Sequence, residues 1–359
     1  VLSFSDTHPA TLMHPGGVVG CALLGLAERD HINGADFLHA LIVGYDVGCR
    51  IGLSIYPWHY NRGWHITGTA GIFGAAAAAG RLLKLNEQQM TWALGIAATQ
   101  AAGLREMFGS MSKNLHIGRA AQGGLMAALL AQKGYTSSGQ SLEAKRGYLN
   151  VLGEAPKLDV ILSELNQRWE IATNTYKPYP CGVVIHPIIE GCVTLAVQHD
   201  IAPAMVEKIA LRCNPLVIEL CGKQTPRDTL EGKLSVFHSA AASVIARRMG
   251  EREYSAEMVN RADVVALRGK IEVTVDPAIR EDETDVTIHL NNGKKMHTHI
   301  DHVIGSEQRP MSDKDMEAKC HGLVETVLPQ ERIMPLVDAC WNIDKLADVA
   351  TLTQLAAAS

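Results

Sequence analysis

A long run of small and aliphatic residues between Leu104 and Gly134 constrains the fold of this chain more than any other stretch. From Leu115 onward it carries almost no charge, which is typical of a helix that close neighbours bury on most sides. Ser112 is a suitable residue to cap the start of that helix. Helices rich in glycine and alanine can approach one another closely, so the sequence predicts a compact helical domain here.

Three basic side chains, Lys113, His116 and Arg119, fall on one face of the first turns of this predicted helix. Cations are unfavourable at a helix N-terminus, because the helix dipole is already positive there. An anion bound among these side chains would make the arrangement favourable, since the backbone N–H groups, the helix dipole and the side chains would all attract it. The alternative is that the two cations are solvated and that His116 is a hydrogen-bonded core histidine.

A histidine followed by a helix rich in small residues recurs at His14, His65 and His186. Pro15 and Pro187 suit the first helical position after two of them, and Thr67 or Thr69 could cap the helix after His65. Each histidine would then lie near a positive helix end, and several such ends meeting would form one anion pocket. The alternative is a set of independent structural histidines.

Length and composition set the class of protein. A chain of 359 residues with 47% hydrophobic content can bury a large core and has room for about two domains. The net charge of -5 gives no general attraction to nucleic acid or to anionic membranes. No apolar run is expected to reach the roughly 18 residues that span a bilayer, and the start resembles no signal peptide. We therefore expect a cytoplasmic protein that binds neither nucleic acid nor membrane.

The 8 cysteines contain no C-x-x-C pair. Their scatter favours reduced, mostly buried thiols over a disulfide framework, an iron–sulfur cluster or a structural zinc site. Neither a P-loop nor a dinucleotide-binding glycine motif is present, so a nucleotide cofactor has no support.

Hydrophobic periodicity divides the chain near Tyr176. Residues 1–175 have the pattern of successive helices, including Ala35 to Ile51 and Glu87 to Gly103. Residues 176–311 mix helices with alternating segments, and we expect a smaller α+β domain there. Its predicted helices are 186–199, 234–249 and 256–262, and its predicted strands are 206–213, 270–275, 285–290 and 295–300. The turn Asn291-Asn292-Gly293 joins the last two strands in a hairpin, and residues 312–359 return to helix and rejoin the first domain.

Two other constellations have simpler explanations. His297, His299 and His302 suggest a metal site, but they lie on a hairpin arm with charged surroundings. Asp6, Thr7 and His8 suggest a triad, yet the chain has no G-x-S-x-G serine elbow. We therefore expect neither a bound metal nor nucleophilic hydrolysis.

The remaining set is His14, His65, Lys113 and His116, with Lys177 and His186 as further members. A histidine with a pKa near neutrality can take or give a proton, while lysine and helix ends hold carboxylates and stabilise enolate-like charge. This is suitable chemistry for small carboxylate substrates.

Several motifs, taken together and in order, resemble those of the MmgE/PrpD family, which includes 2-methylcitrate dehydratases, cis-aconitate decarboxylases and iminodisuccinate epimerases. The motifs are SDTHPATLMHPGG, GWHITGTAGIFGAAAAAG, FGSMSKNLHIGRAAQGGL, YKPYPCGVVIHPIIEG, PRDTLEGKLSVFHS and RPMSDKDMEAKC. The resemblance implies a mainly α protein with a large all-helical domain, a smaller α+β lid, a homodimer, and an interdomain active site without metal or organic cofactor. The N-terminal helical segment of the family is absent from this sequence.

Carried over residue by residue, the resemblance makes Thr7, His14, His65 and Lys113 the catalytic residues. It places His116 beside Lys113 in the same motif, and His186 matches a later family histidine. With Lys177, these two are the expected substrate-binding residues. Two departures concern proton-moving groups: Ser3 replaces an acidic residue, and Gly182 stands where some members have a catalytic histidine.

The sequence therefore supports two hypotheses, both built on a small di- or tricarboxylate. The first is a cofactor-independent lyase or isomerase, such as a 2-methylcitrate dehydratase, a decarboxylase or an epimerase. In it, His65 or His14 moves the proton next to a carboxylate, Lys113 and His116 hold charge, and Thr7 orients the substrate. The second is a degenerate family member that binds a carboxylate metabolite without catalysis, as Ser3 and Gly182 would suggest.

Overall fold

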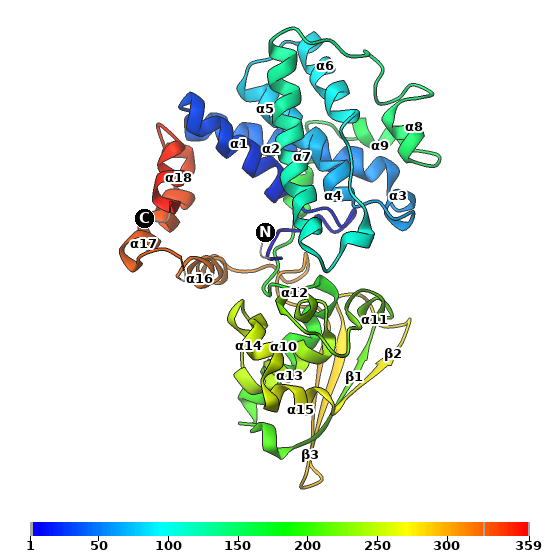
Figure 1. The fold of residues 1–359 in the computed structure, drawn as a ribbon, viewed down its shortest axis with the longest axis vertical. Coiled ribbons are helices and arrows are strands. Elements are labelled where there is room, and N and C mark those ends of the chain that lie inside the picture. Colours follow the sequence, from blue (N-terminus) through cyan, green and yellow to red (C-terminus); the bar gives the residue numbers. More distant parts are fainter. Residues whose placement is uncertain (1–2, 326, 358–359) are drawn as a thin grey trace. The chain divides into compact units, whose positions relative to one another are not determined.

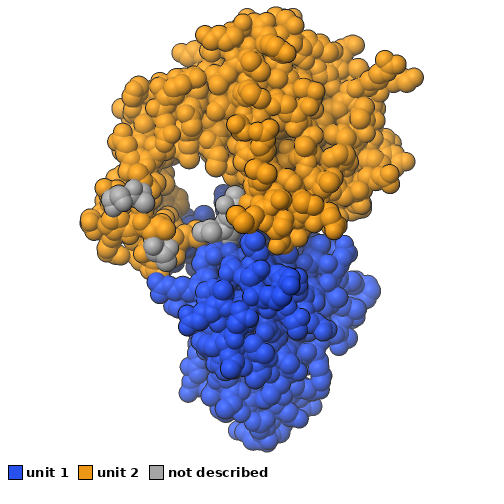
Figure 2. Space-filling model, viewed as in Figure 1, with its two compact units in different colours: residues 1–4, 176–319 blue, residues 5–175, 320–359 orange. Residues whose placement is uncertain are grey.

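The computed structural model describes residues 3–325 and 327–357, and these form two compact units (Figures 1 and 2). Unit 1 comprises residues 3, 4 and 176–319, and unit 2 comprises the described residues of 5–175 and 320–357. Helices dominate, and the described residues contain one four-stranded sheet, so the mainly α prediction is confirmed. The lid arrangement of the smaller unit stays a prediction.

Unit 2 consists of helices and short 3-10 turns. Its elements are α1 (Pro15–Asp30), α2 (Gly34–Ile55), α3 (Trp58–Asn61), α4 (Ile66–Thr69), α5 (Gly71–Leu82), α6 (Glu87–Ala98), η1 (Arg105–Met107), α7 (Met111–Gln132), α8 (Tyr148–Leu152), α9 (Leu158–Leu162), η2 (Glu170–Thr173), α17 (Gln330–Trp341), η6 (Ile343–Lys345) and α18 (Ala350–Ala356). Helix α16 (Asp313–Val324) contains the boundary between the units.

Helix α5 is the centre of unit 2, with α1, α2, α6 and α7 packed around it (Figure 1). Every residue from 71 to 80 is buried. Glycines make this approach possible: a Cβ on Gly44 of α2 would lie 2.8 Å from the Gly74 carbonyl oxygen, and one on Gly124 of α7 would lie 2.6 Å from the Ile72 carbonyl oxygen. The small residues of α2, α5 and α7 therefore allow the backbones of these helices to come into contact.

The C-terminal helices complete a hydrophobic cluster of unit 2. Leu328, Ile333, Leu336 and Leu352 pack with residues of α1 and α2 such as Leu23. The start of α2 lies directly against the chain at η6, where Gly34 N–H donates to the Leu346 carbonyl at 2.8 Å. Residues 328–352 thus share a hydrophobic cluster with α1 and α2.

A buried polar network holds the 161–170 segment against α2. The Arg50 guanidinium donates to the Asp46 carboxylate at 2.7 Å and to the carbonyls of Ser163 and Arg168 at 2.6 and 2.7 Å. Glu170 accepts from the His8 ring at 3.1 Å in the same interior. Because their partners surround them, these charges can be buried.

Helix α2 is long and apolar enough to cross a membrane by length and composition, contrary to the expectation that no run would be. Its most apolar 18-residue window has a mean hydropathy of 1.3, and 61% of that window is buried inside the protein. Burial of this kind, together with Asp46 and Arg50, is typical of a core helix.

Unit 1 packs helices against a four-stranded sheet. Its elements are η3 (Val183–Ile185), α10 (His186–Gln198), η4 (Pro203–Met205), β1 (Val206–Cys213), α11 (Leu216–Cys221), α12 (Thr229–Gly232), α13 (Val236–Ala246), η5 (Arg252–Tyr254), α14 (Ala256–Asn260), α15 (Ala262–Arg268), β2 (Ile271–Val275), β3 (Thr284–Leu290) and β4 (Lys295–Ile300). The core joins α10, α13 and α15 to the apolar face of the sheet.

The sheet has the order β2-β1-β3-β4, with β1 parallel to β2 and antiparallel to β3. The predicted hairpin is confirmed: β3 and β4 pair antiparallel, and Gly293 adopts a φ of 81° in the turn. A glycine adopts that left-handed conformation without strain. All four predicted strands are present.

Several predicted helix starts are wrong. Ser110, not Ser112, precedes α7, and its hydroxyl donates to the Met107 carbonyl at 2.7 Å instead of capping the helix. Neither Thr67 nor Thr69 caps a helix, because both lie inside α4. The predicted helix at 256–262 ends at Asn260, and α15 begins as a separate helix at Ala262.

Candidate active site

Helix α4 is the element around which the predicted site residues of unit 2 gather. His65 is its N-cap residue and is buried. The His65 N–H donates to the Gly103 carbonyl at 3.0 Å, which ties α4 to the loop before η1. Gly103 has a φ of 140°, and a Cβ there would lie 3.2 Å from the His116 ring. Gly103 thus supplies both the backbone conformation and the space that the site needs.

The imidazole rings of His65 and His116 are in direct contact. Their Nδ1 atoms are 3.0 Å apart and their ring centroids 5.2 Å apart. Phe108 packs edge-on against the His65 ring at 5.1 Å. A hydrogen bond between two imidazole nitrogens requires a proton on one and a lone pair on the other. The pair therefore shares one Nδ1 proton.

Burial and positive neighbours favour the neutral form of both rings. Burial, then Lys113, His116 and Arg105, lower the pKa of His65 well below its usual value. Burial and Lys113 lower the pKa of His116. Among the described residues, no carboxylate contributes to either shift. The site concentrates positive charge that a bound carboxylate would offset.

His14 joins the same region through α4. It precedes α1, and its backbone N–H donates to Thr67 Oγ1 in α4 at 3.1 Å. Its Nδ1 donates to the Asp6 carbonyl at 2.7 Å and lies 3.3 Å from Thr7 Oγ1. In the neutral ring this arrangement leaves Nε2 unprotonated, as a proton acceptor requires. Thr7 is buried and pairs with Thr175 through two backbone hydrogen bonds of 2.8 Å.

Asp6 orders this region in a way that sequence reasoning missed. Its carboxylate accepts from the Gly16 N–H at 3.0 Å, from the Tyr45 hydroxyl at 2.8 Å and from the Asn174 amide at 2.9 Å. Gly16 lies in the first turn of α1, so the negative charge sits at the positive end of that helix. The sequence signal was weak because Asp6 lies well before the helix that it stabilises.

A pocket of about 300 Å³ opens beside His116. One part of its wall is basic, with His116 and Arg119, and another part is apolar, with Leu104, Met107 and Leu115. None of the described residues that line it is acidic, and His65 is not among them. His116 is therefore the member of the imidazole pair that the pocket reaches.

Lys177 and His186 belong to unit 1, where they are neighbours. Lys177 Nζ donates to the Cys181 carbonyl at 3.4 Å. His186 begins α10 and is buried, and its Nε2 has no hydrogen-bond partner among the described residues. Burial, then Lys177, lowers the pKa of His186 well below its usual value.

The two departures from the family pattern have different surroundings. Ser3 adopts a φ of 62° and is partly buried. Gly182 lies against Cys221, because a Cβ on Gly182 would be 2.4 Å from the Cys221 sulfur. A larger side chain at position 182 would therefore require Cys221 to move.

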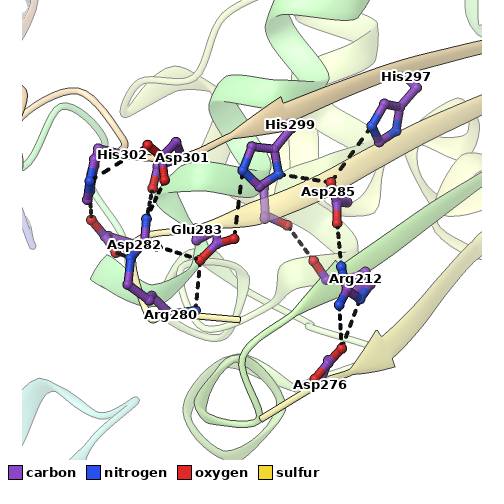
Figure 3. Close-up of polar contacts among 11 residues, drawn as sticks. Arg212, Asp276, Arg280, Asp282, Glu283, Asp285, His297, His299, Asp301 and His302 are labelled. Carbon is purple, nitrogen blue, oxygen red and sulfur yellow. Dashed lines mark hydrogen bonds and ion pairs between the residues drawn. The ribbon is translucent and has the colours of Figure 1, made fainter. Parts of the chain in front are cut away.

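The histidine cluster of the β3–β4 hairpin is an ion-pair network (Figure 3). His299 Nδ1 and His297 Nε2 lie 2.9 and 3.7 Å from Asp285 Oδ1, and Arg212 donates to Asp285 at 2.8 Å. His302 pairs with Asp282. Among the described residues, no group of three or more His, Cys, Asp or Glu side chains is placed to hold a metal ion.

Two features indicate the class of protein. An α+β unit is inserted in the sequence of a mainly helical chain, and histidines lie at the starts of helices. The sequence matches the MmgE/PrpD N-terminal domain over residues 1–161 and the MmgE/PrpD C-terminal domain over residues 179–343. The chain belongs to the MmgE/PrpD family.

Several relatives are named cis-aconitate decarboxylases. The chain is 28% identical to the enzyme from Aspergillus terreus over 382 residues, which cover 98% of this chain and 77% of that protein. It is 26% identical to the mouse enzyme and 25% identical to the human one, each over 99% of this chain and over 75% and 76% of those proteins.

Proposed function

We propose that this protein is a lyase that decarboxylates cis-aconitate or a closely related tricarboxylate. The observation that carries the proposal is the His65–His116 pair, whose surroundings are cationic and, within the part of the chain that the structure describes, contain no carboxylate that shifts either pKa. The names of the relatives support the same substrate class. The site residues keep the roles that the sequence predicts, and these roles are part of the proposal.

Decarboxylation suits this set of groups. Breaking the bond to the departing carboxyl carbon releases CO₂ and leaves an electron pair on the carbon framework, where a proton must be added. One proton is consumed in each turnover. His65, or His14 after its Nε2 has taken up a proton, delivers it, while Lys113 and the N-terminus of α7 hold carboxylates and stabilise the developing negative charge. Thr7 orients the substrate, and Lys177 and His186 of unit 1 are further proposed contacts.

Dehydration of 2-methylcitrate is a weaker candidate for this chain. It requires a second group to protonate the departing hydroxyl, and Ser3 and Gly182 remove two side chains that could do so. Epimerisation needs only proton removal and return, and the same imidazoles suit it. A cytoplasmic homodimer stays a prediction.

Binding without catalysis is the second candidate, and the contact between Gly182 and Cys221 favours it. Cys221 fills the space that a side chain at position 182 would enter. A chain without the side chain that transfers a proton at this position would still bind the carboxylate but would no longer convert it.

The test is incubation of the full chain with cis-aconitate, 2-methylcitrate or iminodisuccinate, each followed by proton NMR. We expect cis-aconitate to be consumed with formation of a five-carbon dicarboxylate. Lys113→Met should lower kcat by about 100-fold or more. The control Lys133→Met, at the other end of α7, should retain wild-type turnover. Stabilisation by cis-aconitate in a thermal shift assay, with no conversion of any substrate, would favour binding without catalysis.

A further inference from the structure

We infer that His116 sets the tautomer of His65 and thereby decides whether the buried ring presents an N–H or a lone pair at Nε2. The basis is the contact of 3.0 Å between the two Nδ1 atoms, together with a pocket that reaches only one of the two rings. His116 is then a positioning residue that acts through His65. The kinetic part of the test rests on the proposed function, and the spectroscopic part does not.

A hydrogen bond between two Nδ1 atoms exists in two forms. In the first, His65 donates and its Nε2 carries a lone pair. In the second, His116 donates, and neutral His65 carries its proton on Nε2. A protonated His116 has N–H groups at both nitrogens and permits only the second form. Protonation of His116 therefore turns His65 Nε2 into a proton donor without giving His65 a charge. When Nε2 gives its proton to the substrate, the proton on His116 Nδ1 moves to His65 Nδ1, so both rings end neutral.

Burial determines which ring accepts the extra proton. His65 is 1% exposed, whereas His116 is half-buried and lines the pocket. A charge costs more free energy in the more buried ring. The first proton added to the pair therefore goes to His116, and the charge stays beside the pocket.

The neighbouring charges make the protonation of His116 depend on whether an anion is bound. Among the described residues, the charges that lower the pKa values of the pair are those of Lys113 on α7 and Arg105 on η1, and Arg119 of α7 lines the pocket beside His116. They oppose protonation of His116 while the site is empty of anions. A carboxylate beside them offsets that repulsion, so binding an acid favours the donor form of His65. The substrate itself prepares the group that protonates it.

Two substitutions, His116→Asp and His116→Asn, separate this role from packing. The two introduced side chains are similar in size, and each would place one polar atom near the position of the His116 Nδ1. A carboxylate only accepts, so H116D holds a proton on His65 Nδ1. At a pH where His65 is neutral its Nε2 then carries no proton, and kcat for cis-aconitate should fall by about 100-fold or more. An amide donates or accepts, so H116N should keep kcat within about tenfold and lose the pH dependence that His116 confers. Repulsion between the new carboxylate and the substrate would raise KM, so kcat is the deciding quantity.

Imidazole nitrogen NMR of the full ¹⁵N-labelled chain tests the inference without substrate. As His116 titrates, His65 Nδ1 should lose its proton and Nε2 should become fully protonated, while His65 stays neutral. In H116D, His65 Nδ1 should stay protonated at every pH. A wild-type His65 whose tautomer does not change as His116 titrates would overturn the inference, as would equal losses of kcat in H116D and H116N. The expected nitrogen pattern without turnover of any acid would overturn the proposed function alone.

Discussion

Lowering the pH from 7 to 5 should destabilise unit 2 through one buried imidazole, His59. Its Nδ1 donates to the Leu152 carbonyl at 2.6 Å, and its Nε2 lies 2.7 Å from Thr69 Oγ1. Trp64 stacks on the ring, with an interplanar angle of 8°. Burial lowers the pKa of His59 from 6.5 to about 4. The folded protein therefore keeps this ring neutral at a pH where the unfolded chain protonates it.

The sign and the size of this change in the free energy of unfolding follow from proton linkage. The folded pKa lies below the unfolded pKa, so the stability is fully present above pH 6.5 and falls as the pH drops from 6.5 to about 4. With those two values, protonation of the unfolded chain costs about 2 kcal/mol of folding free energy between pH 7 and pH 5. A single imidazole thus accounts for a large share of the stability of a typical domain.

Urea unfolding at the two pH values measures this loss. All 5 tryptophans lie in unit 2, so their fluorescence follows unfolding of that unit. His59→Asn removes the titrating ring, and the variant should lose about 2 kcal/mol less than wild type between pH 7 and pH 5. His39→Asn, at an exposed position of α2, should keep the wild-type pH dependence. If His59→Asn loses as much stability as wild type, the folded protein does not hold His59 neutral and the reasoning fails.

Two further predictions concern packing and buried charge. Gly44→Ala should lower the free energy of unfolding by about 1–3 kcal/mol, because its Cβ would meet Gly74 and Val19 at 2.8 Å or less. Gly25→Ala, on an open face of α1, should raise the free energy of unfolding by up to about 1 kcal/mol. If urea unfolding shows similar effects for Gly44→Ala and Gly25→Ala, the packing argument is wrong. Arg50→Met should lower the free energy of unfolding by about 3–5 kcal/mol, because it leaves the buried Asp46 unpaired, and a loss below about 1 kcal/mol would contradict this.

Local sequence signals predicted much of the fold. The hairpin between β3 and β4 needs only alternating residues and a glycine that adopts a positive φ, and both features lie within the segment itself. Helix α10 begins at His186, as the predicted range 186–199 has it, and Pro187 stands at its second position instead of its first. Pro15 opens α1 as expected.

Capping failed where distant partners compete for a hydroxyl group. Thr67 Oγ1 accepts from the His14 N–H, and Thr69 Oγ1 lies 2.7 Å from the His59 ring. His14 precedes Thr67 by 53 residues and His59 precedes Thr69 by 10, so both partners lie outside the helix start that a capping pattern covers. Sequence reasoning can find a residue able to cap, but the tertiary structure decides what its side chain binds.

The candidate site was predictable as a set of residues and not as an arrangement. Basic residues at helix starts are visible in the sequence, and the motifs of the family single out the same positions. The Nδ1 contact between His65 and His116 depends on how α4 packs against α7, which no spacing along the chain specifies. The anchoring of His14 by Thr67 and of α1 by Asp6 depends on packing in the same way.

The C-terminal helices have a consequence for the order in which the molecule is made. Leu328, Ile333 and Leu352 complete a core that includes Leu23 and Phe37, which leave the ribosome some three hundred residues earlier. During synthesis, all the residues of unit 1 emerge before that core can close. The part of α1 and α2 that these C-terminal helices cover then stays exposed in the nascent chain, and chaperones can reach it until residues 328–352 have emerged.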